Sequence, residues 1–426
     1  MSAAASSCRP NRATPARQLA LEVTTLIRER SAFANELIQS KVRQARVAPE
    51  ERDFAILLIR GVVATSGELD YLLDCALHQG TIKPDVRDAL RISAYELFFL
   101  KKAAHIAVDQ GVELVRSFAP QATGFANKVL HETAKLRDGF PFGNPTTDPQ
   151  ALAHQHAFPL WLTQRLISDL GYEMAALFME ASNQQAPLFL VDLKLGTSLE
   201  ITPTELKDYL PRIEAGEMIV VDDSAQKVAV LATPATDRPF LEVGSGRGTK
   251  TILLAHNARR THGAQPQLFA LDLHAFKHGV LSRRVEAYGL DRITPVVGDA
   301  TRLDTLIADG RLPESFAGVL VDAPCSGTGT LRRHPEIRWR LTPEAVTSLA
   351  TQARAMLVSV APYTDEGGFI VYSTCSVLAE ENEQVIEDFL ASNAGKGFAL
   401  DGELLRSSLA PGSPDAHFAA RLVKKL

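Results

Sequence analysis

Two cysteines, three aspartates and a glycine loop are the residues of this 426-residue chain whose types and spacing could do chemistry. Cys325 and Cys375 each follow an apolar stretch that predicts a β-strand, and each is followed by a serine. A lone cysteine is usually a small buried apolar residue, which fits Cys75 on an apolar helical stripe. Cys325 and Cys375 instead fall in predicted loops, and we expect both at the sheet edge that carries the glycine loop.

The glycine loop lies within LEVGSGRGTKT, which closes a predicted strand and opens a predicted helix. Gly244, Gly246 and Gly248 let the backbone turn sharply and approach a ligand, and the helix N-terminus offers free N–H groups. Such loops serve nucleotides, nicotinamide cofactors and S-adenosylmethionine alike, and some are tight turns that bind nothing. The loop alone therefore leaves the ligand open.

Acidic residues at the ends of later strands narrow this choice. A carboxylate in the position of Asp272 can accept both ribose hydroxyls of an adenosine, and Asp299 suits the edge of the adenine. Asp322 ends a further predicted strand, just before Cys325. One strand-end aspartate is more often a helix cap than a ligand contact, but three after a glycine loop favour a ligand at the carboxyl edge of an open α/β sheet.

The elements that position these residues follow a strand–helix–strand rhythm. Helical stretches at 275–288 and 344–360 separate apolar strands, and a last strand is expected at 417–423. The other expected strands are at 240–243, 268–271, 293–297, 318–321 and 369–372. This alternation predicts a catalytic domain over 236–426, built on a mostly parallel sheet with helices on both faces.

The rest of the chain divides into three parts. Residues 1–15 form a loose tail, which includes Cys8, and apolar stripes at helical spacing predict an all-α bundle over 16–140. A segment rich in proline and glycine at 138–149 is the best domain boundary in the sequence. A small α+β module is expected over 150–235, with strands in PLFLVDL and EMIVVDD.

Composition excludes several classes of protein. Apolar residues make up 46% of the chain and charged residues 22%, so each domain can bury a core. No apolar run is long enough for a membrane span, the first residues lack the apolar segment of a secretory signal, and no CxxC pair indicates a metal site. We expect a cytoplasmic monomer. The net charge is +3 over 1–140 and −8 over 141–426, so RNA contact must come from local patches.

The motifs around both cysteines resemble the RsmB-like (Sun/Fmu) family of RNA 5-methylcytosine methyltransferases. Asp322-Ala-Pro-Cys325-Ser-Gly-Thr-Gly and Tyr372-Ser-Thr-Cys375-Ser carry the resemblance. Further similar segments are Arg333-His-Pro-Glu336, Glu380-Glu-Asn-Glu383, Val221-Asp-Asp-Ser-Ala-Gln226 and His417-Phe-Ala-Ala-Arg-Leu422. His105–Val115 and Gly124–Leu130 resemble the NusB-like RNA-binding domain of this family, so the similarity covers nearly the whole chain.

The resemblance implies a Rossmann-like S-adenosylmethionine-dependent methyltransferase that modifies carbon 5 of a cytosine in RNA. That carbon is a poor nucleophile until a thiolate adds to carbon 6. In the family, the cysteine at the position of Cys375 forms this adduct, and the one at Cys325 assists product release. Asp322 would hydrogen-bond the exocyclic amine and ring nitrogen 3 of the base, which must be flipped out or single-stranded.

The resemblance also assigns binding residues. The cofactor would contact Gly244, Ser245, Gly246, Arg247, Gly248, Thr249, Lys250, Asp272, Asp299 and Asp322. The family usually has Cys-Ala-Ala-Pro-Gly-Gly-Lys in this loop, of which Gly248 and Lys250 keep their places. Basic residues around Trp339, a possible stacking surface, are expected to contact RNA; they are Arg332, Arg333, Arg338 and Arg340.

Three other functions fit parts of the sequence. Small-subunit (16S) ribosomal RNA is the expected substrate because of the NusB-like domain, and transfer RNA is the nearest alternative. A non-catalytic RNA-binding or ribosome assembly factor would explain the altered glycine loop but not both cysteines. A nicotinamide-dependent dehydrogenase would explain the glycine loop but neither the cysteines nor the helical domain.

Overall fold

The computed structural model describes residues 13–77 and 79–426, which form two compact units. Unit 1 takes the chain up to Ser168 together with Arg333–Arg340, and unit 2 comprises Asp169–Arg332 and Leu341–Leu426. Cys8 and most of the expected tail 1–15 lie outside the described residues. Unit 1 therefore extends beyond the domain boundary expected at 138–149, and it includes the short segment Arg333–Arg340 from much later in the chain.

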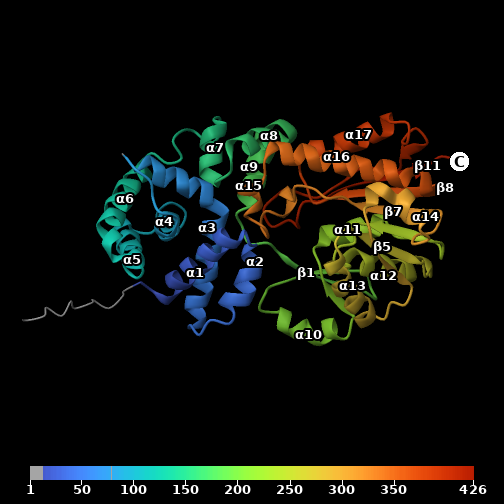
Figure 1. Cartoon of the computed structure of the whole chain (residues 1–426), viewed down its shortest axis with the longest axis horizontal. Coiled ribbons are helices and arrows are strands. Elements are labelled where there is room, and N and C mark those ends of the chain that lie inside the picture. The colour runs from blue at the N-terminus through green and yellow to red at the C-terminus, as the bar shows by residue number, and fades with distance from the viewer. Residues whose placement is uncertain (1–12, 78) are drawn as a thin grey trace, which may run out of the picture. The chain divides into compact units, whose positions relative to one another are not determined.

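Unit 1 is helical, as the apolar stripes predict. Its longer helices are α1 (Pro15–Arg30), α3 (Pro49–Cys75), α4 (Pro84–Phe98), α5 (Ala104–Arg116) and α6 (Thr123–Lys135). Three of them begin with proline, whose fixed φ suits the first helical position and whose missing N–H is not needed there. The short α2 (Ala34–Leu37) continues into a π-helical turn, η1 (Ile38–Val42). Successive long helices pack side by side (Figure 1).

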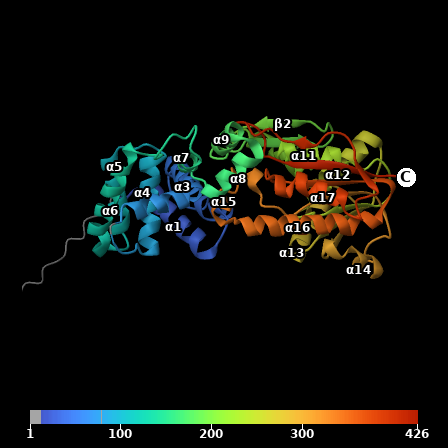
Figure 2. The same ribbon diagram turned by 90° about the horizontal axis from the view of Figure 1, so that it is seen from above.

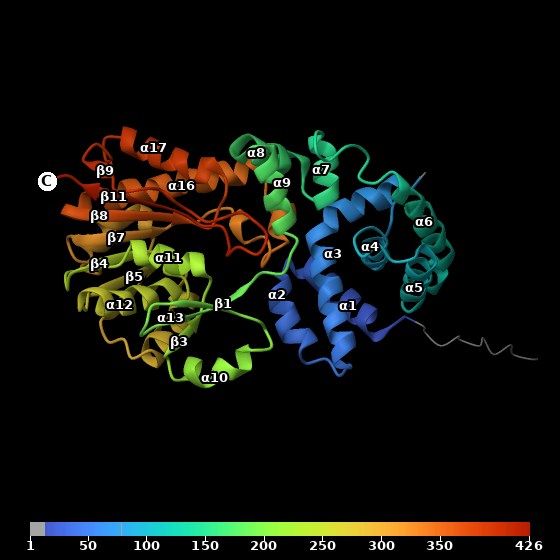
Figure 3. The same ribbon diagram turned by 180° about the vertical axis from the view of Figure 1, so that it is seen from behind.

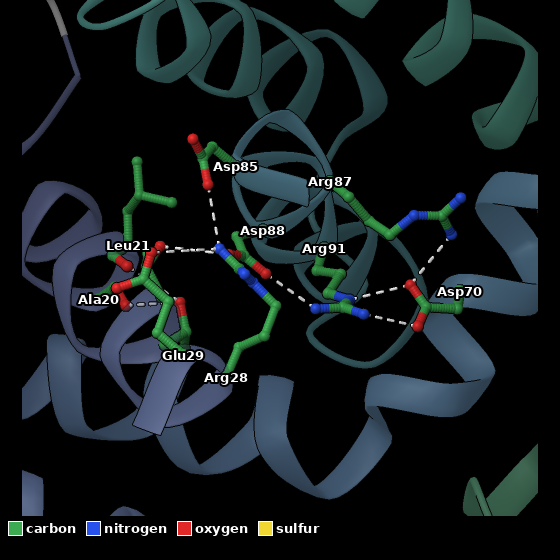
Figure 4. Close-up of polar contacts among 11 residues, drawn as sticks. Ala20, Leu21, Arg28, Glu29, Asp70, Asp85, Arg87, Asp88 and Arg91 are labelled. Atoms are coloured by element: carbon green, nitrogen blue, oxygen red, sulfur yellow. Dashed lines mark hydrogen bonds and ion pairs between the residues drawn. The ribbon is translucent and has the colours of Figure 1, made fainter. Parts of the chain in front are cut away.

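A network of ion pairs joins α1, α3 and α4 of unit 1, with Asp88 buried at its centre (Figure 4). Arg28 contacts Asp88 at 2.8 Å, and Arg91 bridges Asp88 and Asp70 at 2.8 and 2.6 Å. Arg87 contacts Asp70 at 3.1 Å. These arginines therefore have carboxylate partners within the bundle.

Unit 2 contains a small antiparallel sheet before the glycine loop. Its strands are β1 (Leu188–Asp192), β2 (Ser198–Ile201) and β3 (Met218–Val220), in the order β2-β1-β3. The two strands expected in PLFLVDL and EMIVVDD are therefore confirmed. Val191 and Ile219 pack with α11 (Asp223–Leu231) and α12 (Thr249–His262).

The large sheet of unit 2 has eight strands in the described part of the chain, and seven of them follow the order β10-β11-β8-β7-β4-β5-β6. The strands are β4 (Phe240–Val243), β5 (Leu268–Asp272), β6 (Ile293–Val297), β7 (Phe316–Asp322), β8 (Thr364–Thr374), β9 (Phe398–Leu400), β10 (Leu405–Arg406) and β11 (Phe418–Lys424). β4 to β8 pair in parallel, whereas β11 pairs antiparallel with β8, β9 and β10. The expected mostly parallel sheet is confirmed.

Helices cover both faces of this sheet, so the strands are buried on both sides. α14 (Leu303–Ala308), α16 (Pro343–Val360) and α17 (Glu383–Ala391) pack on one face, with α16 beside α17 (Figure 2). α11, α12 and α13 (Ala275–Ala287) cover the other face (Figure 3). The carboxyl ends of β4, β5, β7 and β8 consequently meet at one edge. None of the helices in residues 13–77 and 79–426 is long and apolar enough to cross a bilayer.

Candidate active site

The two sequence-predicted cysteines face each other across the ends of adjacent strands. β7 and β8 pair in parallel with Asp322 opposite Ser373, so the loops that follow carry Cys325 and Cys375 side by side. Their Sγ atoms are 3.5 Å apart, and both thiols are free and partly exposed. The Gly329 N–H donates to the Cys375 carbonyl at 2.8 Å, which joins the two loops.

A buried network of hydroxyls and one carboxylate fixes this arrangement. Glu381 accepts hydrogen bonds from the Ser326 backbone N–H at 2.6 Å and from the Ser326 hydroxyl at 2.5 Å. The Ser376 hydroxyl lies 3.3 Å from that of Ser326 and 3.1 Å from that of Thr328. The serine that follows each cysteine is held in this network, which therefore couples the two thiol-bearing loops. The sequence offered only the acidic run 380–383 as a signal for Glu381.

The surroundings of Cys325 favour its protonated form. The hydrogen bond with Cys375, burial, and the negative charges of Cys375 and Glu381 raise the pKa of the Cys325 thiol well above its ordinary value. A thiol is a nucleophile or base only as the thiolate. Cys325 is therefore a neutral thiol at neutral pH while Cys375 stands unmodified beside it.

A partly buried ion pair lies next to the cysteines. Lys250, near the start of α12, donates to Asp322 Oδ2 at 2.7 Å, and the Ser373 hydroxyl donates to Oδ1 at 2.9 Å. Burial lowers the pKa of Lys250, but the Asp322 carboxylate and then the Cys375 sulfur outweigh burial, so that pKa is raised. Lys250 thus remains an ammonium group, close enough to Cys375 for the sulfur to contribute to its raised pKa.

The glycine loop approaches Asp322 so closely that a side chain would not fit. A Cβ atom on Gly244 would lie 2.2 Å from the Asp322 carbonyl oxygen, and its φ of +78° is costly for any other residue. Gly248, with φ of +81°, would press a Cβ against Leu281 at 2.2 Å. The loop therefore presents backbone without side chains at the N-terminus of α12. An adenosine-containing ligand, with or without phosphates, could approach the backbone closely there.

The strand-end aspartates have unequal surroundings. Asp272 is 5% exposed and accepts from the Gly246 N–H at 3.0 Å and from Lys277 Nζ at 3.1 Å. It therefore ties the glycine loop to β5. Asp299 caps a short 3₁₀ helix by accepting from the backbone and hydroxyl of Thr301, the role that a lone strand-end aspartate often has. Contacts of either residue with a cofactor remain predictions.

Two further titratable residues, Glu242 and His417, lie beside this centre. In the sequence, His417 was noted only as part of a segment that resembles the family. Glu242 of β4 is 1% exposed and accepts from the Thr251 hydroxyl, and burial raises its pKa to about 8. His417 contacts the Ser224 hydroxyl through Nδ1 at 2.7 Å. Burial, followed by the charge of Lys250, lowers the His417 pKa to about 4, so its ring is neutral.

The basic residues expected to contact RNA do not form one surface. Arg338 is fully buried, with its guanidinium 4.1 Å from the Phe158 ring centre, so the expectation of RNA contact is wrong for this side chain. Trp339 donates its indole N–H to the Ala64 carbonyl at 2.8 Å and is partly buried on α3, which argues against a free stacking surface. The physical reason for both differences is that Arg338 and Trp339 pack against other parts of unit 1 and so are not free to contact RNA.

The remaining basic residues divide between the units. Arg332 belongs to unit 2 and donates to the Pro414 carbonyl at 2.6 Å. Arg333 and Arg340 belong to unit 1, and Arg340 is exposed. RNA contact by these three residues remains a prediction. Across residues 13–77 and 79–426, no cluster of three or more His, Cys, Asp or Glu could hold a metal ion.

Comparisons with known proteins match both halves of the chain. The family of 16S rRNA methyltransferases RsmB/F matches residues 228–399, and the NusB family matches 14–135. A probable ribosomal RNA small subunit methyltransferase B of Synechocystis sp. is 30% identical over 88% of this chain and 89% of its own length. A protein of the same name from Bacillus subtilis is 26% identical over 88% of each chain. The crystal structure of PH0851 has a TM-score of 0.75 at 20% identity, covering 96% of this chain and 99% of that one, which shows a shared fold.

Proposed function

We propose that this chain, which belongs to the RsmB/F family of 16S rRNA methyltransferases, methylates carbon 5 of a cytosine through a covalent adduct with Cys375. Membership of the family makes it an S-adenosylmethionine-dependent RNA methyltransferase of the small ribosomal subunit. The position on the base and the covalent step are the proposal. The pair of free thiols 3.5 Å apart, at the ends of two adjacent parallel strands, is the observation that carries it.

The glycine loop fits the cofactor that the family implies. Gly244 and Gly248 bring bare backbone to the carboxyl edge, and the buried Asp272 carboxylate lies directly behind the loop. These residues would hold the adenosine and its attached chain. When bound, S-adenosylmethionine supplies an electrophilic methyl group.

The first step belongs to Cys375. The Asp322 carboxylate keeps the Lys250 ammonium group charged near Cys375, and a neighbouring cation is the kind of group that favours attack by a cysteine as its thiolate. That thiolate adds to carbon 6 of the flipped cytosine and forms a carbon–sulfur bond, and the electron pair of the 5,6 double bond makes carbon 5 nucleophilic. Asp322 would meanwhile accept a hydrogen bond from the exocyclic amine, and a proton shared between its carboxylate and ring nitrogen 3 would offset the negative charge that develops there.

The last step belongs to Cys325, and the geometry supplies a reason for its timing. The largest cause of its raised pKa is Cys375 itself. Once Cys375 is a neutral thioether, both its hydrogen bond and its negative charge are gone, so Cys325 ionises more easily. Its thiolate can then remove the proton from carbon 5 while the carbon–sulfur bond breaks and the Cys375 thiolate leaves. Cys325 therefore becomes a base only after the adduct exists.

Bisulfite sequencing of ribosomal and transfer RNA, from cells with and without this gene, tests the proposed function. Loss of one methylated cytosine in small-subunit ribosomal RNA is expected. Loss in a transfer RNA instead would move the substrate to the alternative class. No change in any RNA would contradict cytosine methylation and favour the non-catalytic binding factor.

A further inference from the structure

Unit 1 carries a group of exposed cations that lack the carboxylate partners of its other arginines. The arginines of Figure 4 are paired with Asp70, Asp85 and Asp88. In contrast, several exposed cations of unit 1 form no ion pair with any residue that the structure describes, and five of these lie between residues 41 and 60 or at position 340. They are Lys41, Arg43, Arg46, Arg60 and Arg340. The segment 38–46, which follows α2, contains three of them and no acidic residue.

Arg43 and Arg60 are brought together despite their like charges. Arg43 directly follows the π-helical turn η1, and Arg60 projects from α3. The pKa of Arg60 is lowered by burial and then by the positive charge of Arg43. Its guanidinium makes one long hydrogen bond, to Asn35 Oδ1 at 3.4 Å. Like charges that face one another without a counterion repel, and an anion that binds both would relieve the repulsion.

An exposed aromatic ring and a third arginine extend this group. Phe33 is 42% exposed, and the Arg340 guanidinium lies 5.6 Å from its ring centre. Arg340 is held there because it donates to the carbonyls of Ser31 and Ala32 at 3.1 and 2.8 Å. Asn35 also donates to the Arg333 carbonyl at 2.5 Å, which joins the surface at Arg60 to the segment that carries Arg340. We call Phe33, Arg43, Arg60 and Arg340 the basic surface.

We propose that the basic surface binds the phosphate backbone of the RNA substrate, with Phe33 available to stack on an unpaired base. The proposal rests on the proposed function for the identity of the polyanion. Arginine suits phosphate because its guanidinium presents several donors in a fixed plane, and an aromatic ring beside arginines is typical of single-stranded RNA sites. An acidic protein could also bind the arginines of the basic surface, but it would have no use for an exposed aromatic ring on which a base can stack.

The test is RNA binding by the full-length chain with Arg43→Glu and Arg60→Glu combined. The probe is a synthetic fragment of small-subunit ribosomal RNA that contains unpaired loops, measured by filter binding at several salt concentrations. Each lost phosphate contact lowers the salt slope by about 0.7 for single strands. We therefore expect the slope to fall by about 1.4 and the affinity at low salt to fall at least about tenfold.

A matched control makes the same change in net charge elsewhere on unit 1. Lys83→Glu with Lys128→Glu reverses two exposed lysines that also lack ion pairs with any described residue, and it should leave both affinity and salt slope near the wild-type values. Circular dichroism and thermal melting establish that both variants fold. Phe33→Ala should weaken binding severalfold without changing the slope.

Wild-type affinity and salt slope in the Arg43→Glu, Arg60→Glu variant would overturn the proposal, and so would an equal loss in the lysine control. The outcome is separable from the proposed function, because binding is measured without methyl transfer. A wild-type chain that binds RNA through this surface but methylates no cytosine would contradict only the proposed function. Affinity for S-adenosylhomocysteine should be unchanged in all three variants.

Discussion

The proposed order of events requires Cys375 to suppress ionisation of Cys325, and removal of Cys375 measures that suppression. We expect Cys375→Ala to make Cys325 more reactive toward iodoacetamide, because its hydrogen bond and negative charge are the first and third causes of the raised Cys325 pKa. Two unit charges 3.5 Å apart repel by about 5 kcal/mol at an effective dielectric constant of about 20, which is an upper limit.

Less than a third of that energy already produces a measurable effect. Because about 1.4 kcal/mol corresponds to a factor of ten in thiolate population, alkylation of Cys325 at pH 7 should accelerate at least about tenfold. The assay is the initial rate of alkylation, read from the Cys325 peptide by mass spectrometry. Cys8 and Cys75 are replaced by serine in every protein compared.

A steric explanation is tested by Cys375→Ser. Serine retains nearly the bulk of cysteine and can still hydrogen-bond Cys325, but it carries no ionised sulfur. It should therefore still accelerate Cys325 alkylation, although by less than alanine does. The pH dependence separates the causes further, because easier access raises the rate equally at every pH. An alkylation profile for Cys325 that is the same with and without Cys375 would refute the coupling, and with it the delayed activation of Cys325.

Three further outcomes follow from the geometry of the site. Glu381→Gln, which can still pair with Ser326 but without charge, should cost about 1 kcal/mol in chemical unfolding, whereas Glu381→Ala should cost about 3 kcal/mol; equal losses would contradict the hydrogen-bonding role. Gly244→Ala, whose Cβ would lie 2.2 Å from the Asp322 carbonyl oxygen, should weaken S-adenosylhomocysteine binding in calorimetry at least about tenfold, and Gly246→Ala, whose nearest contact is 3.8 Å, should weaken it less. Glu242 has a pKa of about 8 in the folded protein, so the folded state binds this proton more tightly than the unfolded state does. The free energy of unfolding should therefore fall by up to about 1.4 kcal/mol per pH unit as the pH rises from about 4.5 to 8. Glu242→Gln should flatten that slope, and an unchanged slope would show that Glu242 is not the cause.

The sequence predicted the catalytic unit well because its signals are local. Apolar runs that end in a glycine, an aspartate or a cysteine specify where strands stop, and parallel strands stop at one edge. β4 and β6 have the predicted bounds, and β7 ends at Asp322 as required. The meeting of Cys325 with Cys375 followed from the same pattern, because their strands proved to be neighbours.

The features that the sequence did not predict depend on tertiary contacts, which local sequence patterns do not encode. Arg338 looks like a surface cation in a run of charges, yet it is buried against Phe158, which lies 180 positions earlier in the chain. Glu381 was one acid among several, and its two bonds to Ser326 arise only when the two loops fold together. The lack of carboxylate partners around Arg43 and Arg60 is likewise a property of the folded surface.

The central claim is that Cys375 forms a bond with the substrate which Cys325 helps to break. The most direct measurement is a denaturing gel of the Cys325→Ala variant after incubation with a small-subunit ribosomal RNA fragment and S-adenosylmethionine. We expect a stable RNA–protein adduct whose cross-linked peptide contains Cys375, and none when Cys375→Ala is added to the same variant. Normal turnover by Cys325→Ala without any adduct would contradict the assignment of both cysteines.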